Sequence, residues 1–204
     1  MGYTAIIDYG VGNLKSVSNA LAYLGVDSEI TGDPCRLELA DAIILPGVGA
    51  FPDAADKLRE SGLEQILLRQ AGNKPILGIC LGMQLLFQWG EEGRRCEGLG
   101  LISGGVRRIE TDLKLPHIGW NSLTFPRPSP LFRGLDDGCC VYFVHSFCGH
   151  TEDPDQEAAV TDYGGPVLAA VQDAARGVFG CQFHPEKSGE TGLAILQNFA
   201  ALNR

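Results

Sequence analysis

The sequence predicts an α/β fold in which a mostly parallel central sheet is flanked by helices and carries a small antiparallel extension. Three features support this fold class. The first 90 residues alternate short apolar strands with segments of helical periodicity, an order typical of parallel sheets. Residues 74–89 have the pattern of a strand, a sharp turn and a helix. After residue 95, short segments bounded by Gly and Pro are typical of antiparallel strands.

The amino-terminal half supplies the parallel strands. Residues 4–8 form a short apolar run that leads into a helix with apolar side chains on one face. We expect further strands at 28–31 and 42–45, and a helix over 58–70. The next strand ends at Cys80, and apolar spacing predicts a helix over 81–89. The carboxyl ends of these strands form the edge of the sheet where active sites of such folds lie.

The carboxyl-terminal half is expected to form short strands and a closing helix. The predicted strands are 99–102, 106–109, 119–125, 140–147, 158–162, 167–172 and 178–183, and the helix is 191–202.

Composition bounds the function. The chain has 204 residues, enough for a single domain over 1–204, and 16 basic against 25 acidic residues give a net charge of −9. No basic cluster could neutralise a nucleic-acid backbone, and no signal peptide or membrane-spanning run is present, so we expect a cytoplasmic protein. Seven scattered cysteines without a C-x-x-C motif indicate reduced thiols, and we expect neither a metal nor a cofactor.

Cys80 lies on the turn between a strand and a helix, with glycine at positions 78 and 82. A nucleophile on such a turn adopts a strained backbone conformation, and small neighbours allow substrate and backbone to approach. Amides at the start of the following helix favour the thiolate. The alternative is that Cys80 is a buried, unreactive cysteine of the core.

Backbone amides near Cys80 could stabilise an oxyanion. Attack on an amide carbonyl creates such an anion, which needs N–H donors placed in advance. Leu81 supplies one candidate, and the loop containing Gly47, Val48 and Gly49 could supply another, since glycine permits close approach and peptide rotation. The same loop could instead be an ordinary strand-to-helix connection.

Three of the four histidines are poor candidates for a base. His150 lies among polar residues and is expected to be solvated, whereas His117 could line a surface. His145 lies within an apolar strand, where a hydrogen-bonded core histidine is the ordinary interpretation.

The fourth histidine, His184, has a carboxylate two residues away. In extended backbone, residues i and i+2 project to the same side, so Glu186 should reach the imidazole. A surface turn is the alternative, but together with Cys80 these residues predict a Cys-His-Glu triad.

Two motifs resemble those of the class I, triad-type glutamine amidotransferases: Gly78-Ile79-Cys80-Leu81-Gly82-Met83-Gln84 and Phe183-His184-Pro185-Glu186. The resemblance extends over essentially the whole chain. Four more segments are similar to those of the glutaminase subunits of imidazole glycerol phosphate synthase in histidine biosynthesis; they are residues 8–14, 46–51, 116–121 and 142–147.

This resemblance implies hydrolysis of glutamine to glutamate and ammonia. Cys80 would be the nucleophile, His184 the general acid and base, and Glu186 its orienting partner. The family also implies a heterodimer with a (β/α)₈-barrel cyclase subunit that receives the ammonia. That subunit converts a ribulosyl nucleotide intermediate to imidazole glycerol phosphate and aminoimidazole carboxamide ribotide.

The resemblance also assigns substrate contacts. Gln84 should help to hold glutamine, with Gly47, Glu92 and Ser146 as further contributors. Many class I amidotransferases have consecutive glycines after the loop proline, whereas Val48 interrupts them here. We therefore expect an oxyanion hole that forms only when a peptide near Val48 rotates.

The partner should cap the active site, because ammonia released into bulk water would be protonated and lost. Asn13 and Lys15 follow the first strand at the same edge of the sheet, and Trp120 is a large aromatic of the kind that anchors interfaces. The alternatives make Trp120 a core residue and Lys15 a solvated helix charge.

Two other functions remain open from the sequence. A stand-alone cysteine hydrolase of similar fold would not need Gln84 or the Trp120 segment and would be fully active without a partner. A non-catalytic regulatory subunit would not need the intact triad.

Overall fold

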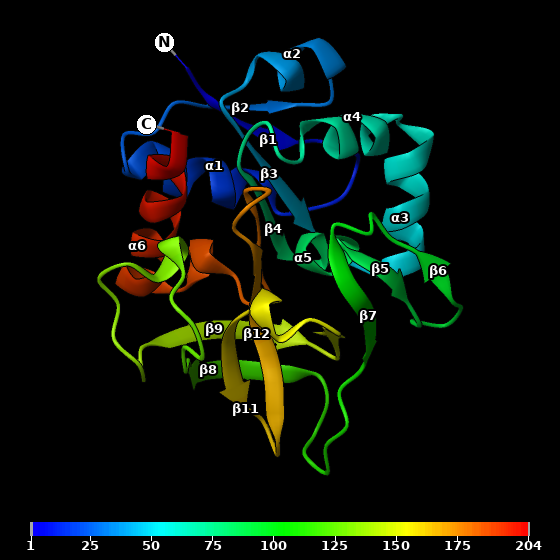
Figure 1. Cartoon of the computed structure of the whole chain (residues 1–204), viewed down its shortest axis with the longest axis vertical. Helices are drawn as coiled ribbons and strands as arrows, with labels where there is room; N and C mark the ends of the chain where they lie inside the picture. Colours follow the sequence, from blue (N-terminus) through cyan, green and yellow to red (C-terminus); the bar gives the residue numbers. More distant parts are fainter. Residues whose placement is uncertain (1, 204) are drawn as a thin grey trace.

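The computed structural model describes residues 2–203 and is built on a seven-stranded sheet of order β11-β12-β13-β4-β3-β1-β2 (Figure 1). Five neighbouring strands are parallel, and β12 and β11 extend the sheet with antiparallel pairing. The strands are β1 Thr4–Ile7, β2 Ser28–Thr31, β3 Ala42–Gly47, β4 Ile76–Cys80, β11 Glu157–Asp162, β12 Pro166–Asp173 and β13 Val178–Cys181. The predicted fold class is confirmed.

Helices cover both faces of this sheet, because alternate strand residues point to opposite sides (Figure 1). Ile6 and Ile44 pack with α1 (Leu14–Tyr23) and α6 (Gly189–Ala200). Ile7 and Leu45 belong to the core on the other face. The helices of that face are α2 Pro34–Leu39, α3 Phe51–Glu60, α4 Leu63–Gln70 and the short α5 Leu81–Leu85.

The extension consists of two further small sheets. One has four strands in the order β10-β7-β5-β6, and the other pairs β8 with β9 antiparallel. Their bounds are β5 Phe87–Gly90, β6 Cys96–Glu97, β7 Ile102–Arg108, β8 His117–Ser122, β9 Cys140–His145 and β10 Phe147–His150. Four 3₁₀ turns complete the described chain: η1 Pro130–Phe132, η2 Pro154–Gln156, η3 Pro185–Lys187 and η4 Ala201–Asn203.

Several predicted boundaries were wrong. The single helix expected over 58–70 is two helices, because Gly62 takes a left-handed conformation with φ 74° between α3 and α4. The helix expected over 81–89 ends at Leu85, and the chain continues as β5. The strands expected at 99–102 and 106–109 are one strand, β7, and α2 was not predicted. Across residues 2–203, no helix is long and apolar enough to span a membrane.

Candidate active site

Cys80 occupies the sharp turn between β4 and α5. Its backbone has φ 55° and ψ −113°, and within residues 2–203 it is the one non-glycine residue with positive φ. Such a conformation costs about 1–3 kcal/mol and is concentrated at functional sites. The turn brings α5 against β3 so closely that a Cβ on Gly82 would lie 1.8 Å from the Leu45 carbonyl oxygen. Gly82 is therefore required by backbone packing at the turn rather than by access of a substrate.

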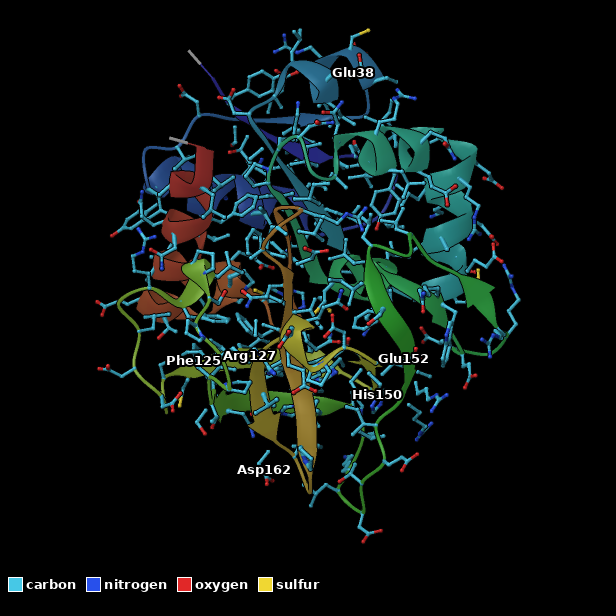
Figure 2. The ribbon with its side chains drawn as sticks, in the orientation of Figure 1. Glu38, Phe125, Arg127, His150, Glu152 and Asp162 are labelled. Carbon is cyan, nitrogen blue, oxygen red and sulfur yellow. The ribbon has the colours of Figure 1, made fainter. Side chains whose placement is uncertain are left out.

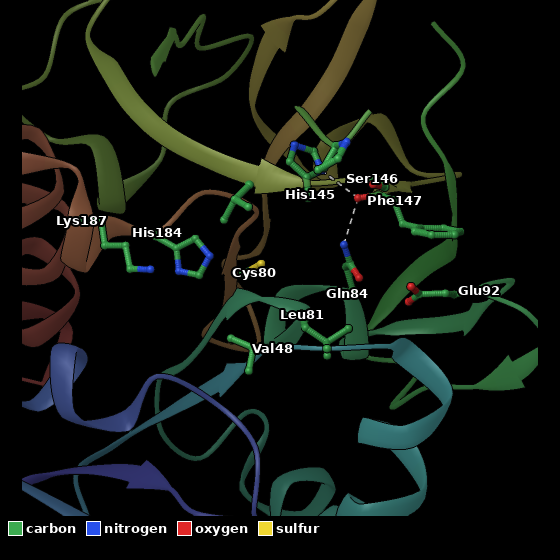
Figure 3. A pocket seen from close by; sticks show the side chains of 13 residues that line it. Val48, Cys80, Leu81, Gln84, Glu92, His145, Ser146, Phe147, His184 and Lys187 are labelled. Atoms are coloured by element: carbon green, nitrogen blue, oxygen red, sulfur yellow. Dashed lines mark hydrogen bonds between the residues drawn. The ribbon is translucent and has the colours of Figure 1, made fainter. Parts of the chain in front are cut away.

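A cavity of about 390 Å³ opens beside the Cys80 thiol (Figure 3). Figure 3 shows His184 and Gln84 on opposite sides of Cys80. Most of the predicted site residues line this cavity: Val48, Gly49, Cys80, Leu81, Gln84, Glu92, Ser146 and His184. Two do not. Glu186 lies behind His184, and Gly47 packs against Gly82, where an added Cβ would lie 2.8 Å from the Gly82 nitrogen.

His184 and Glu186 are hydrogen-bonded, Nδ1 to Oε1, at 2.8 Å, and both side chains are almost fully buried. The reason given from sequence was wrong, since residues 185–187 form the 3₁₀ turn η3 rather than extended backbone. The turn brings the carboxylate back towards the imidazole. Ser188 fixes it by donating from Oγ to the His184 carbonyl at 2.6 Å and accepting from the Tyr142 N–H at 3.0 Å.

The environment of His184 favours its protonated form. Burial alone would lower the pKa of His184, but hydrogen bonding with Cys80 and Glu186 outweighs burial and raises that pKa to about 9. An imidazolium next to a thiol stabilises the thiolate. The three side chains can therefore hold a reactive sulfur and a proton donor together at neutral pH.

The other histidines are not placed to serve Cys80 as a base. His150 is exposed and lies with Glu152 beside β7, well away from α6 (Figure 2). His117, expected to line a surface, is fully buried, because it stacks between Phe143 and Tyr163. His145 is buried as predicted, and burial lowers its pKa to about 4, so it is neutral.

The loop after β3 starts from a fixed point. The Tyr9 hydroxyl donates to the Pro46 carbonyl at 2.9 Å, and burial raises the Tyr9 pKa, so the hydroxyl stays protonated. Val48 and Gly49 are exposed beyond this point, and Gly49 has φ 98°, a conformation that favours glycine. A change of peptide orientation in this loop must therefore occur after Pro46.

Gln84 and Glu92 have defined partners inside the protein. Gln84 Nε2 donates to the Phe147 carbonyl at 3.0 Å and to Gln182 Oε1 at 2.9 Å. Glu92 Oε2 accepts from the Phe51 N–H at 2.8 Å, which ties β5 to the start of α3. Each side chain keeps one oxygen that no such bond occupies.

Two residues near the thiol were missed from sequence. Gln182 is fully buried, and its Nε2 lies 3.8 Å from Cys80 Sγ. Lys187 lies beside His184 at the edge of the cavity (Figure 3). Gln182 could have been found, because it stands two residues before His184 at the end of a predicted strand, and alternate strand residues share a face.

The predicted interface residues are accessible. Trp120 is 56% exposed on β8, so it is not a core residue, and Ile118 beside it on the same face is 58% exposed. Lys15 is exposed on the first turn of α1, and Asn13 stands at its N-cap without a capping side-chain bond. Whether a partner binds these residues stays a prediction.

Sequence comparison relates nearly the whole chain to one family. A family model described as glutamine amidotransferase class-I matches residues 5–202. Subunit HisH of imidazole glycerol phosphate synthase from Caldanaerobacter subterraneus is 50% identical over 198 residues, which are 97% of this chain and 97% of that protein. The corresponding HisH subunit from Moorella thermoacetica is 48% identical over 202 residues, which are 98% of this chain and 95% of that protein.

Solved structures share the fold. A putative GMP synthase component from Thermoplasma acidophilum has a TM-score of 0.78 at 23% identity, covering 100% of this chain and 94% of that one. PurLQS from Thermotoga maritima has a TM-score of 0.79 at 22% identity, covering 100% and 99%.

Proposed function

Because the chain belongs to the class I glutamine amidotransferase family, we propose that it is the glutaminase subunit of an imidazole glycerol phosphate synthase in histidine biosynthesis. It hydrolyses glutamine to glutamate and ammonia. The observation that carries this proposal is the alignment of Cys80, His184 and Glu186 at the cavity, with the sulfur on a strained turn and the imidazole held at 2.8 Å from its carboxylate.

The reaction begins with attack of the Cys80 thiolate on the side-chain amide carbon of glutamine. The C–N bond of the tetrahedral intermediate then breaks, and the His184 imidazolium gives its proton to the leaving nitrogen, which departs as ammonia. Neutral His184 next removes a proton from water, which attacks the thioester and releases glutamate. Glu186 holds the imidazole in position and balances its charge.

Backbone amides stabilise the oxyanion of each tetrahedral intermediate. Leu81 is the first residue of α5, so its N–H has no acceptor inside the helix and is free for the substrate oxygen. The second donor comes from the loop at Val48 and Gly49, which lines the cavity and is exposed. Because Tyr9 holds the Pro46 carbonyl, rotation of the Val48–Gly49 peptide can complete the hole without moving β3.

Gln84 contributes an acceptor to substrate binding. Both of its amide hydrogens are used by Phe147 and Gln182, so only its Oε1 can address the ligand. The substrate group that it holds must therefore be a hydrogen-bond donor, such as the α-ammonium of glutamine. The second oxygen of Glu92, also at the cavity, suits the same positive group, and Ser146 forms part of the same wall.

A second subunit receives the ammonia, and we propose that it is a (β/α)₈-barrel cyclase that docks over the mouth of the cavity. Supporting this, β9 carries Val144 and His145 at the cavity and pairs with β8, whose outer side presents Ile118 and Trp120. The decisive test measures glutamine hydrolysis by the isolated chain, and then with the cyclase and its nucleotide ligand. Full activity of the isolated chain would favour a stand-alone hydrolase instead.

Replacing Trp120 with alanine should weaken cyclase binding about thirtyfold, because truncation of a central interface aromatic costs about 2 kcal/mol or more. Exposed at 56%, Trp120 should leave the isolated fold intact on removal. Titration calorimetry with the cyclase measures the affinity, and circular dichroism checks the fold. Leu39→Ala is the matched control, since Leu39 is 69% exposed at the end of α2, near the opposite edge of the sheet (Figure 1). Equal affinities of the two variants would exclude Trp120 from the interface.

The rate of glutamine hydrolysis should fall above pH 9. The pKa of His184 is raised to about 9, so the imidazolium persists up to that pH and is lost as the pH rises through it, which removes the proton donor for the leaving ammonia. Glu186→Gln removes one of the interactions that raise this pKa and should move the alkaline limb to lower pH. Glu190→Gln, an exposed carboxylate on α6, should leave the profile unchanged. A Glu186→Gln profile that coincides with that of the unmodified enzyme would refute the assigned partner.

A further inference from the structure

We propose that Gln182 is a further catalytic residue, whose amide N–H donates to the Cys80 sulfur and holds it as a thiolate before substrate arrives. This inference rests on the proposed function of the same cavity. Gln182 lies directly after β13 and is fully buried, with its Nε2 3.8 Å from Cys80 Sγ. Its backbone is fixed as well, because its N–H donates to the Ala169 carbonyl at 2.8 Å.

A backbone carbonyl determines which end of this amide faces the sulfur. The Phe147 oxygen can only accept, so the Gln84 atom 3.0 Å from it must be the nitrogen. That nitrogen also lies 2.9 Å from the side-chain end of Gln182, which must therefore be the oxygen. The remaining end of the Gln182 amide, its nitrogen, is the one that points at Cys80. The chain Phe147, Gln84, Gln182 thus guarantees a donor at the sulfur.

Burial gives this contact its effect. Gln182 is shielded from water, and within residues 2–203 the sulfur is the acceptor that its Nε2 reaches. A hydrogen bond to a charged group in such a place is stronger than one in water. The donor therefore increases the fraction of Cys80 present as thiolate, but it also makes each thiolate a weaker nucleophile, because nucleophilicity falls as proton affinity falls.

These two effects predict a crossing of pH profiles. Loss of the donor should raise the pH of half-maximal Cys80 alkylation by roughly one unit, the lower end of what a charge-assisted hydrogen bond provides. On the acid limb the tenfold smaller thiolate fraction is partly offset by higher nucleophilicity, which leaves alkylation about threefold slower. On the alkaline plateau the variant should react about threefold faster. A residue that only supported the fold would not reverse its effect with pH.

The test is alkylation of the full chain by iodoacetamide between pH 5 and about 10, with Cys80 quantified by peptide mass spectrometry. Gln182→Met removes the donor while keeping a side chain of similar length. The matched control is Gln172→Met, since Gln172 is also a buried strand glutamine but donates to the Pro128 carbonyl. Gln84→Met provides a second test from α5, because it removes the bond that orients Gln182, and it should shift the profile in the same direction by less.

Crossing profiles for Gln182→Met, with an unchanged profile for Gln172→Met, would support the inference. Profiles that coincide with that of the unmodified chain would overturn it, and if Gln182→Met does not fold, an unchanged Gln84→Met profile would do so. The readout does not require glutaminase activity. If the profiles coincide while the chain still hydrolyses glutamine, only the role of Gln182 is refuted; if no glutamine is hydrolysed with the partner present, the proposed function fails.

Discussion

Cys80→Ala should abolish glutamine-dependent synthesis by the complete synthase while leaving synthesis from added ammonium salt intact. The thiolate is needed only to release ammonia from glutamine, so an external supply bypasses it. Loss of a nucleophile from such a triad typically lowers turnover by about 10⁴-fold or more. Product formation is measured with each nitrogen source in the presence of the cyclase.

The matched control for this variant is Cys148→Ala. Cys148 is equally buried, but burial raises its pKa to about 12, so it remains an unreactive thiol at neutral pH. This variant should keep both activities. Equal loss of both activities in Cys80→Ala would instead show that Cys80 is needed for the fold or for docking, and its assignment as nucleophile would be wrong.

Local sequence patterns predicted the strands of the central sheet because each strand is buried and its apolar run is continuous. The ends of β1 and β2 differ from the prediction by at most one residue. The missed helix α2 did have a local signal: Asp33 accepts from the Cys35 N–H at 2.9 Å as an N-cap, and Pro34 follows it. Attention to capping residues would have found it.

The predicted helix over 81–89 failed because distant pairing overrides local spacing. Trp89 packs over Gly105 of β7, so closely that a Cβ at position 105 would lie 2.3 Å from the indole. Arg95 and Arg107 also place their guanidinium groups 4.4 and 4.9 Å from the centroid of that ring. None of these contacts is visible in the spacing of residues 81–89 alone.

The same limit applies to the site. Cys80, His184 and Glu186 could be identified from the chain because each stands at a strand end beside residues that its chemistry requires. His117 was misplaced because its burial follows from the register of β8 on β9, which sets it directly opposite His145. Such cross-strand register depends on partners 28 residues apart, since His117 Nδ1 and His145 Nε2 lie at 3.1 Å.

His184→Asn should slow labelling of Cys80 by a glutamine-like electrophile by about 100-fold or more, the usual contribution of a positioned acid or base. Asparagine can occupy the space near Glu186 but cannot carry the proton that stabilises the thiolate. Glu186→Gln should slow labelling less, because it removes orientation and charge but leaves the imidazole. Rates are measured from the mass of the Cys80 peptide over time.

The control distinguishes His184 from a general effect of losing a histidine. His150 is exposed, and its Nε2 lies 3.5 Å from Cys148 Sγ, so His150→Asn should label at the normal rate. Slow labelling of His150→Asn together with normal labelling of His184→Asn would mean that the base had been assigned to the wrong histidine. Because His184 is held by Glu186 on one side and faces Cys80 on the other, the expected order of rates is His150→Asn, then Glu186→Gln, then His184→Asn.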